Sequence, residues 1–218
     1  TDLKPALTQI KLDSKYLKHL SGTKVIGNVK FYKEDKKIDE RSGEILFTNY
    51  GISGPPILDL FVNVTENNFI EVPIINNVDE NTKEMLYSRY YMFPDFSLEE
   101  FLIGIVDKKF VHYIIDSLDL DKKIAMNMIS ILEFEKIVDL LLKSRFKVTG
   151  TNGFKNSQVT RGGVELSQIN SFDYSVKKID GLYVIGEALD IDGDCGGYNL
   201  HFAIACGYRL GKILSNKN

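Results

Sequence analysis

The sequence predicts a chain of mixed α and β structure, arranged as three consecutive segments of different character. Residues 1–75 contain short runs of β-branched and aromatic residues, which are typical of strands. Residues 76–145 carry apolar residues at helical intervals, which predict a small helical segment. Residues 146–218 begin with an alternating strand pattern and end in a glycine-rich turn that opens a helix. With 218 residues, the chain is long enough to bury a sizeable core in one or two domains.

In the first segment, strands alternate with turns. Val25–Tyr32 is a run of β-branched and aromatic residues that predicts a strand, and Glu44–Thr48 predicts a second one. The charged stretch Lys33–Ser42 between them is expected to be a loop. A glycine- and proline-rich turn then leads into a helix that is expected to end at about Phe61. Phe69–Ile75 predicts another short strand.

Helix starts in the middle segment are marked by small polar residues. Asp79, Ser97 and Ser130 are expected N-caps. Apolar residues then recur at helical intervals and predict buried helix faces, namely Phe101, Ile105, Phe110, Ile114, Ile115, Leu132, Ile137, Leu140 and Leu141. An aromatic group could stack a ligand, but core packing is the favoured interpretation of Tyr87, Tyr90, Tyr91 and Phe93.

The stretch Leu182–Leu214 holds the best candidate for a ligand-binding edge. Leu182–Ile185 predicts a short apolar strand that ends at Gly186 and Glu187, and an acidic loop leads to Gly196-Gly197-Tyr198-Asn199 at the start of a helix. Free backbone N–H groups and the positive end of a helix dipole suit a phosphate or another electron-rich ligand edge. A carboxylate at the end of a strand is also typical of an acceptor for sugar hydroxyls. An acidic loop that simply leads into a C-terminal helix remains the alternative.

Composition and charge exclude several classes of protein. The net charge of −3 and the pI near 5.7 predict no nucleic-acid partner, and no apolar run is long enough for a membrane span. The first residues have no signal-peptide pattern, which favours a cytoplasmic location. Two cysteines make no disulfide framework, and three histidines far apart in the sequence predict no metal site.

No Gly-x-Gly-x-x-Gly fingerprint follows a strand anywhere in the sequence. That fingerprint opens a dinucleotide-binding fold. Residues 146–218 are therefore interpreted as the closing part of such a fold, and its opening part is expected to be absent from this chain.

Three motifs in the last segment, in order and spacing, are similar to a known family. They are Val159–Val164, Gly181–Asp190 and Gly196–Asn199. Together they closely resemble the bacterial BaiN-like (YhiN-like) NAD(P)/FAD-dependent oxidoreductases. Two stretches of the first segment, Gly43–Thr48 and Gly51–Pro55, resemble the inserted domain of that family. The resemblance therefore extends over nearly the whole chain and corresponds to the C-terminal portion of the family.

The resemblance implies a fold and a set of partners. It implies a β-barrel-like part and a small helical part inserted into a two-dinucleotide-binding-type FAD domain, whose C-terminal part is residues 146–218. The N-terminal Rossmann half, which holds the pyrophosphate-binding glycines, is expected to be missing here. That half is then a partner of this chain, and the fragment alone is expected to be inactive and to retain no FAD. NAD(P)H is the implied electron donor and a small molecule the implied substrate.

The resemblance also assigns roles to single residues. Glu187 resembles the acidic group near the FAD ribityl or phosphate region, and Gly197, Tyr198 and Asn199 resemble a helix start that faces the flavin ring. The turn expected to line the isoalloxazine is formed by Thr160, Arg161, Gly162, Gly163 and Val164. Gly186 and Gly196 complete the expected cofactor-binding set. No catalytic residue is assigned, and the candidates for a proton donor are Tyr198 and His201.

The function implied is hydride transfer from NAD(P)H, through flavin, to an organic acceptor such as an enone. An alternative of a different class remains open. In it, the chain is a non-catalytic insertion module that binds a partner or substrate and keeps only a vestigial flavin edge.

Overall fold

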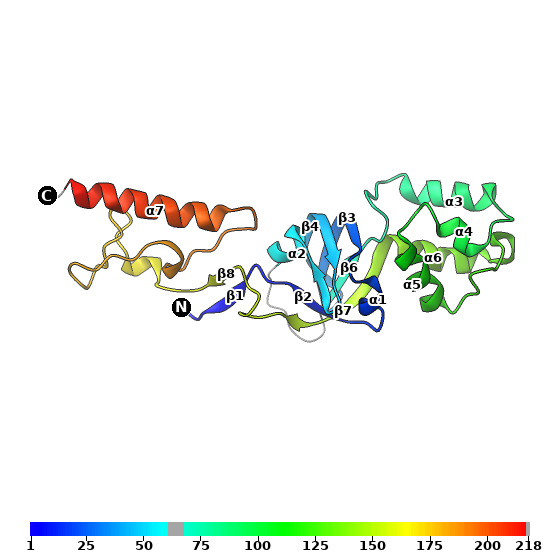
Figure 1. The fold of residues 1–218 in the computed structure, drawn as a ribbon, viewed down its shortest axis with the longest axis horizontal. Helices are drawn as coiled ribbons and strands as arrows, with labels where there is room; N and C mark the ends of the chain where they lie inside the picture. The colour runs from blue at the N-terminus through cyan, green and yellow to red at the C-terminus, as the bar shows by residue number, and fades with distance from the viewer. Residues whose placement is uncertain (61–67, 217–218) are drawn as a thin grey trace. The chain divides into compact units, whose positions relative to one another are not determined.

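The computed structural model describes residues 1–60 and 68–216 and contains two compact units (Figure 1). The larger unit is Ile10–Thr151, and the smaller one combines Thr1–Gln9 with Asn152–Asn218. This division differs from the three expected segments. The strand expected to begin the third segment belongs to the larger unit, and residues 1–9 pair with the C-terminal part of the chain.

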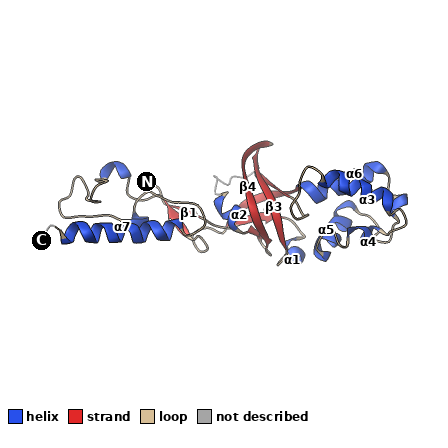
Figure 2. Ribbon diagram, turned by 90° about the horizontal axis from the view of Figure 1, so that it is seen from above, coloured by secondary structure: helices blue, strands red, loops and turns tan. Residues whose placement is uncertain are grey.

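The larger unit contains a closed antiparallel barrel with the strand order β2-β5-β4-β3-β6-β7, drawn in red in Figure 2. Its strands are β2 (Ile10–Asp13), β3 (Lys24–Lys33), β4 (Lys36–Phe47), β5 (Gly51–Ser53), β6 (Asn68–Val72) and β7 (Ser144–Thr151). Two short helices accompany them, α1 (Leu17–Leu20) and α2 (Pro55–Asp59). Because β7 pairs with both β6 and β2, it closes the barrel.

A long hairpin of β3 and β4 forms much of the barrel wall. The expected strand Val25–Tyr32 is confirmed, since it lies within β3. The expected loop Lys33–Ser42 is wrong, because most of it is the first half of β4. The hairpin turns at Glu34 and Asp35, which both have a left-handed backbone conformation. The charged side chains that suggested a loop lie on or near the solvent face, where ion pairs such as Lys37–Glu40 are compatible with a strand.

Two further expectations for this region are settled in part. The helix after the glycine–proline turn is α2, which ends at Asp59, and Phe61 lies outside the described residues. The expected strand Phe69–Ile75 is β6, which ends just before Pro73. Proline has no N–H for a ladder hydrogen bond, so the strand cannot continue through it as a central strand.

The helical part of the larger unit follows β6 in sequence. Its helices are α3 (Thr82–Met92), α4 (Leu98–Leu102), α5 (Lys108–Leu118) and α6 (Ile131–Lys143), with a short 3₁₀ turn, η1 (Met126–Met128). Ser97 and Ser130 are confirmed as N-caps, each within a capping box. Asp79 is not the cap residue of α3, which is Asn81, although its carboxylate accepts a hydrogen bond from the Thr82 hydroxyl at 2.7 Å.

One apolar core joins the barrel to these helices. The Phe47 ring of β4 meets the Phe110 ring of α5 edge-on at 5.3 Å, and Tyr113 of α5 stacks on Phe146 of β7 at 5.9 Å. The expected aromatic packing is confirmed for Tyr87 and Tyr90, whose ring centroids lie 5.3 Å and 4.3 Å from that of Phe134. It is wrong for Tyr91, which is 68% exposed. The helical part and the barrel therefore share one cooperative core and do not have separate ones.

The smaller unit is poorer in regular structure. It has a two-stranded antiparallel ladder of β1 (Lys4–Ala6) and β8 (Val159–Arg161), and two 3₁₀ turns, η2 (Leu166–Gln168) and η3 (Gly186–Ala188). It ends in the longest helix, α7 (Tyr198–Ser215). None of the helices in the described part of the chain has the length and apolar character of a membrane span.

The strand expected at Leu182–Ile185 is wrong. Only an isolated bridge from Tyr183 to Ser175 forms there, together with hydrogen bonds from Val176 N to Leu182 O and from Val184 N to Tyr174 O. A strand needs neighbours along its whole length. Among the described residues, this apolar segment has no sheet to join.

Candidate cofactor-binding site

A groove of about 500 Å³ on the smaller unit contains much of the expected cofactor-binding set. Expected residues that line it are Thr160, Gly162, Gly163, Val164 and Glu187. Thr1, Leu3 and Ala188 complete the lining and were not expected. Leu3 reaches the groove because the segment around β1 pairs with β8, a long-range pairing that no local sequence pattern indicates.

The turn after β8 is held by close backbone contacts that require glycine. Gly162 has φ +96°, and a Cβ there would lie 2.2 Å from the carbonyl oxygen of Asp2. A Cβ on Gly163 would lie 2.6 Å from the carbonyl oxygen of Ala188. Val164 N donates to the same oxygen at 2.9 Å, so the turn is fixed against the segment that carries Glu187. These close contacts fix the path of the turn that lines the groove.

Glu187 connects the two sides of the groove. It lies in η3, directly after Gly186, which has φ +62° and packs against Ala203 of α7. Its carboxylate oxygen Oε1 accepts a hydrogen bond from Thr160 N at 2.5 Å. It also lines a second, smaller cavity of about 170 Å³, to which Asn199 contributes. Glu187 thus stands where the two hollows of this unit meet.

The start of α7 presents amide groups without a capping side chain. Gly197 occupies the N-cap with φ +88°, and within the described part of the chain no side chain caps this terminus. The first amides of a helix have no partner inside it. Asn199 does not act as a cap, because its side chain donates to Gly193 O at 2.8 Å and accepts from Gly193 N at 2.7 Å. It therefore shapes the acidic loop in front of the helix.

Arg161 forms an ion pair that the sequence did not indicate. Its Nη2 lies 2.6 Å from Asp192 Oδ2, and its Nε lies 3.0 Å from both oxygens of that carboxylate. The hydrogen bond to Asp192 raises the pKa of the Arg161 guanidinium, which stays charged. The acidic loop thus has a structural role. The only feature of the sequence that indicated this role was the alternation of aspartates at positions 190, 192 and 194.

The structure does not gather every expected residue at one groove. Gly196, Gly197 and Tyr198 line neither cavity, and the Tyr198 side chain is 66% exposed. His201, one turn further along α7, is also exposed and lines neither cavity. Nowhere in the described ranges do three or more metal-ligating side chains converge.

These features define the class of the protein: a mixed α/β chain with a six-stranded barrel, a helical part and a Rossmann-like part. The HI0933-like protein barrel and H2TH domain matches residues 4–159, and the HI0933-like protein Rossmann domain matches residues 106–213. The chain belongs to the HI0933-like family. The resemblance to BaiN-like flavoproteins is confirmed.

Three curated relatives are similar to this chain. A 3-dehydro-bile acid delta(4,6)-reductase of Clostridium scindens is 26% identical over 98% of this chain and 54% of its own length. Ribosomal RNA dihydrouridine synthases of Haemophilus influenzae and Escherichia coli are 30% and 28% identical, over 80% and 73% of this chain and 43% and 39% of their own lengths. The chain thus spans about half the length of the relatives it matches.

Proposed function

We propose that this chain is part of a flavin-dependent oxidoreductase that uses FAD and takes its electrons from NAD(P)H. The observation that carries the proposal is the glycine-lined groove beside Glu187, in a chain of the HI0933-like family. A bound flavin supplies hydride transfer to such a site.

The residues of this chain fit one edge of a flavin site. Gly162 and Gly163 both line the groove, in a turn that their close contacts with neighbouring backbone hold in place, so their main chain can meet the edge of a flat ring. The amides at the start of α7 can stabilise negative charge on a ligand edge. Glu187 offers a carboxylate to hydroxyl groups, as acceptors in dinucleotide-binding folds do.

We propose that the remainder of the site comes from a Rossmann half outside this chain. An exposed apolar stripe on α7 supports that partner. Leu200, Ile204 and Tyr208 are 68%, 64% and 66% exposed and recur every four residues, so they share one helix face. A continuous apolar face of this kind is a typical contact surface for another protein layer.

We propose that the acceptor contains a carbon–carbon double bond conjugated to a carbonyl group. The names of the relatives support this class. In a 3-dehydro bile acid with a Δ4 double bond, that bond is conjugated to the 3-oxo group. In uridine, the bond that becomes saturated in dihydrouridine is conjugated to a ring carbonyl. Either acceptor needs a hydride at one carbon and a proton at its neighbour.

Tyr198 and His201 are the proton donors that we propose to test first. Tyr198 begins α7, His201 follows one turn later and both are exposed, so each could deliver a proton to a ligand at that helix start. In the full-length enzyme, Tyr198→Phe or His201→Gln should lower turnover by about 10²-fold or more if that residue is the donor. Unchanged turnover in both variants would remove them from the mechanism.

Flavin content separates this proposal from the second candidate, a non-catalytic binding module. The resemblance to a flavoprotein family favours the enzyme, whereas the alternative rests on Glu187 and Asn199 already being bonded within the protein. A longer polypeptide that includes the upstream Rossmann half should absorb near about 450 nm. The 218-residue chain purified in the same way should be colourless. If the longer protein is colourless too, the enzyme proposal fails.

A further inference from the structure

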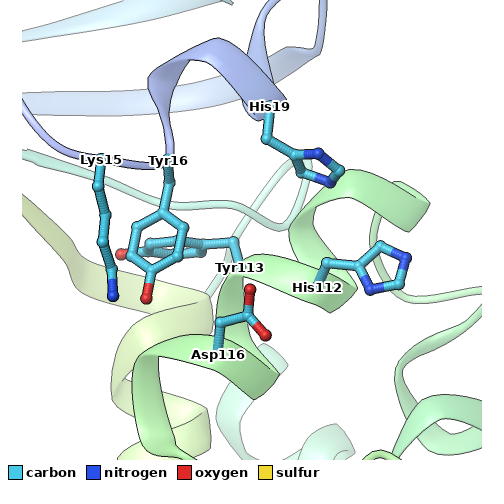
Figure 3. Close-up of a pocket in the computed structure, with 6 residues that line it drawn as sticks. All are labelled: Lys15, Tyr16, His19, His112, Tyr113 and Asp116. Carbon is cyan, nitrogen blue, oxygen red and sulfur yellow. The ribbon is translucent and has the colours of Figure 1, made fainter.

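A separate pocket lies on the larger unit, where α1 meets α5 (Figure 3). It has a volume of about 490 Å³ and is lined by Lys15, Tyr16, His19, His112, Tyr113 and Asp116. We call these six residues the tyrosine–histidine pocket. All of them belong to Ile10–Thr151, and none takes part in the flavin site proposed above.

Four planar rings form the walls of the pocket. In Figure 3 the two tyrosine rings lie on one side of the hollow and the two imidazoles on the other. The Tyr16 and Tyr113 centroids are 5.1 Å apart and those of His19 and His112 are 5.6 Å apart, both pairs edge to face. Tyr113 is buried against Phe146 and gives the wall a rigid support, whereas Tyr16 and His112 are half-buried and His19 is exposed. The pocket therefore offers ring surfaces to a ligand.

Charged groups of both signs surround these rings. The Lys15 Nζ lies 4.9 Å from the centroid of the Tyr16 ring. On α5, the residues Lys108, His112 and Asp116 are spaced by four, so a cation, an imidazole and a carboxylate share one helix face. Within the described ranges, the side chains of His19, His112 and Asp116 have no hydrogen-bond partner in the protein. Their polar atoms are thus available to a ligand.

We propose that the tyrosine–histidine pocket binds a nucleotide unit. The base stacks against the tyrosine and imidazole rings, Lys15 meets a phosphate, and Asp116 accepts a hydrogen bond from an N–H on the edge of the base. Stacking on tyrosine and histidine, together with cations along the backbone, is how proteins hold unpaired bases. Each pocket residue also ends in a polar group or carries a charge, so a ligand that combines a flat ring with polar groups matches the lining.

Two sources can supply this chemistry, a single-stranded RNA or a free nucleotide such as NADPH. The inference revises the expectation that nucleic acid is not a partner. That expectation rested on the net charge of −3, which is a sum over the whole chain and says nothing of a local cluster. The proposed nucleotide binding does not rest on the proposed flavin chemistry, because the pocket lies in a unit that contains none of the flavin-site residues.

The test measures binding by fluorescence anisotropy, with the 218-residue chain and a labelled single-stranded RNA of about 12 mixed-sequence nucleotides at low salt. The double variant H19A/H112A should lower the affinity at least about tenfold, because it removes stacking surface. Lys15→Ala should reduce the slope of log affinity against log salt by about 0.7. Asp116→Asn should alter the preference for guanine, whose edge donates two hydrogens, over adenine.

Competition distinguishes the two sources. Displacement of the RNA by NADPH or AMP at similar concentrations of nucleotide units assigns the pocket to a free nucleotide. Displacement by unlabelled RNA alone assigns it to a strand. In either case, the binding is assigned to this pocket only if the pocket variants weaken the binding of the same ligand.

The matched control is Lys36→Ala, which removes an exposed lysine from the hairpin of the same unit and should leave the affinity unchanged. Circular dichroism checks that each variant is folded, and since His19 is exposed and His112 only half-buried, unfolding of H19A/H112A is not expected. The inference is overturned if the wild-type chain binds neither RNA, NADPH nor AMP. It is overturned equally if folded H19A/H112A binds as tightly as the wild type. No flavin is present, so these outcomes leave the proposed oxidoreductase activity untouched.

Discussion

Three polar side chains near the candidate flavin site form hydrogen bonds within the protein. Glu187 accepts from Thr160 N, Arg161 pairs with Asp192, and Asn199 bonds both backbone groups of Gly193. A side chain used in this way fixes the shape of a loop more than it selects a ligand. Gly162 and Gly163 set the path of the turn that lines the groove, and for that reason the glycines matter most at the residue scale.

The clearest residue-scale prediction concerns Gly54 in the barrel. Its φ is +110°, and a Cβ would lie 2.1 Å from the carbonyl oxygen of Glu44. Gly54→Ala should therefore lower the free energy of unfolding by about 3 kcal/mol, which combines backbone strain with a clash against the main chain. Thermal unfolding followed by circular dichroism measures the effect.

Gly104→Ala is the matched control. Gly104 has φ +89°, but a Cβ there would meet nothing within 4 Å. The control should cost only about 1 kcal/mol, the cost of a left-handed conformation. If both substitutions lower the stability equally, the close approach of Gly54 to Glu44 contributes nothing.

At the scale of elements, the two capping boxes decide where the helices of the larger unit begin. The Ser97 and Ser130 hydroxyl oxygens each accept a hydrogen bond from the amide three residues on. The carboxylate of the glutamate at that position accepts a hydrogen bond from the serine amide. Both helices bury apolar faces in the core, so their start points also fix which residues face the barrel.

Removal of one cap should weaken the unit measurably. Ser130→Ala should lower the free energy of unfolding by about 1 kcal/mol, because the Glu133 amide loses its acceptor. Urea denaturation gives the value. The control is Ser88→Ala, which changes an exposed serine inside α3 and should be neutral or slightly stabilising. If Ser88→Ala lowers the free energy of unfolding as much as Ser130→Ala does, loss of the cap is not the cause of the destabilisation.

The same caps make stability depend on pH. Hydrogen bonds from Ser130 lower the pKa of Glu133 below its ordinary value of 4.5, and those from Ser97 do so for Glu100. A lowered native pKa means that the stabilisation is complete above pH 4.5 and is lost as the pH falls through the native value.

Glu133→Gln should therefore flatten the loss of stability at acid pH, since glutamine keeps the capping box but does not titrate. Urea midpoints compared between about pH 7 and pH 3 measure this. The control is Glu84→Gln, which removes an exposed glutamate of α3 that has no cap hydrogen bond. It should lose as much stability at acid pH as the wild type does. If Glu133→Gln loses as much stability at acid pH as the wild type does, the prediction is contradicted.

At the scale of the whole molecule, stability is concentrated in one unit. Every residue of the main apolar cluster lies between Ile10 and Val148, and the smaller unit adds none to it. The smaller unit instead leaves apolar side chains of α7 exposed. A unit with little buried apolar surface contributes little cooperative stability.

A polypeptide of residues 10–151 should therefore fold by itself. We expect one cooperative thermal transition within about 3 °C of that of the 218-residue chain. Calorimetry on the two polypeptides makes the comparison. Because β7 closes the barrel, a polypeptide that ends at residue 143 is the control and should fail to fold. A disordered 10–151 polypeptide would show that the smaller unit is needed for the barrel.

The sequence by itself determined the mixed α and β character, the strand at Val25–Tyr32, the caps at Ser97 and Ser130, and the family. Each of these depends on neighbours within a few residues or on motifs in fixed order. It also pointed to five residues that the structure places on one groove, namely Thr160, Gly162, Gly163, Val164 and Glu187.

Only the tertiary structure decided what depends on distant partners. Lys36–Ser42 became strand because β3 lies beside it. Leu182–Ile185 did not, because the part of the chain that the structure describes offers it no neighbouring strand. The tyrosine–histidine pocket joins residues about a hundred positions apart, and the long-range contact of α1 with α5 creates it. Strand pairing and pockets are set by packing between segments that are remote in the sequence, and a local sequence pattern does not predict that packing.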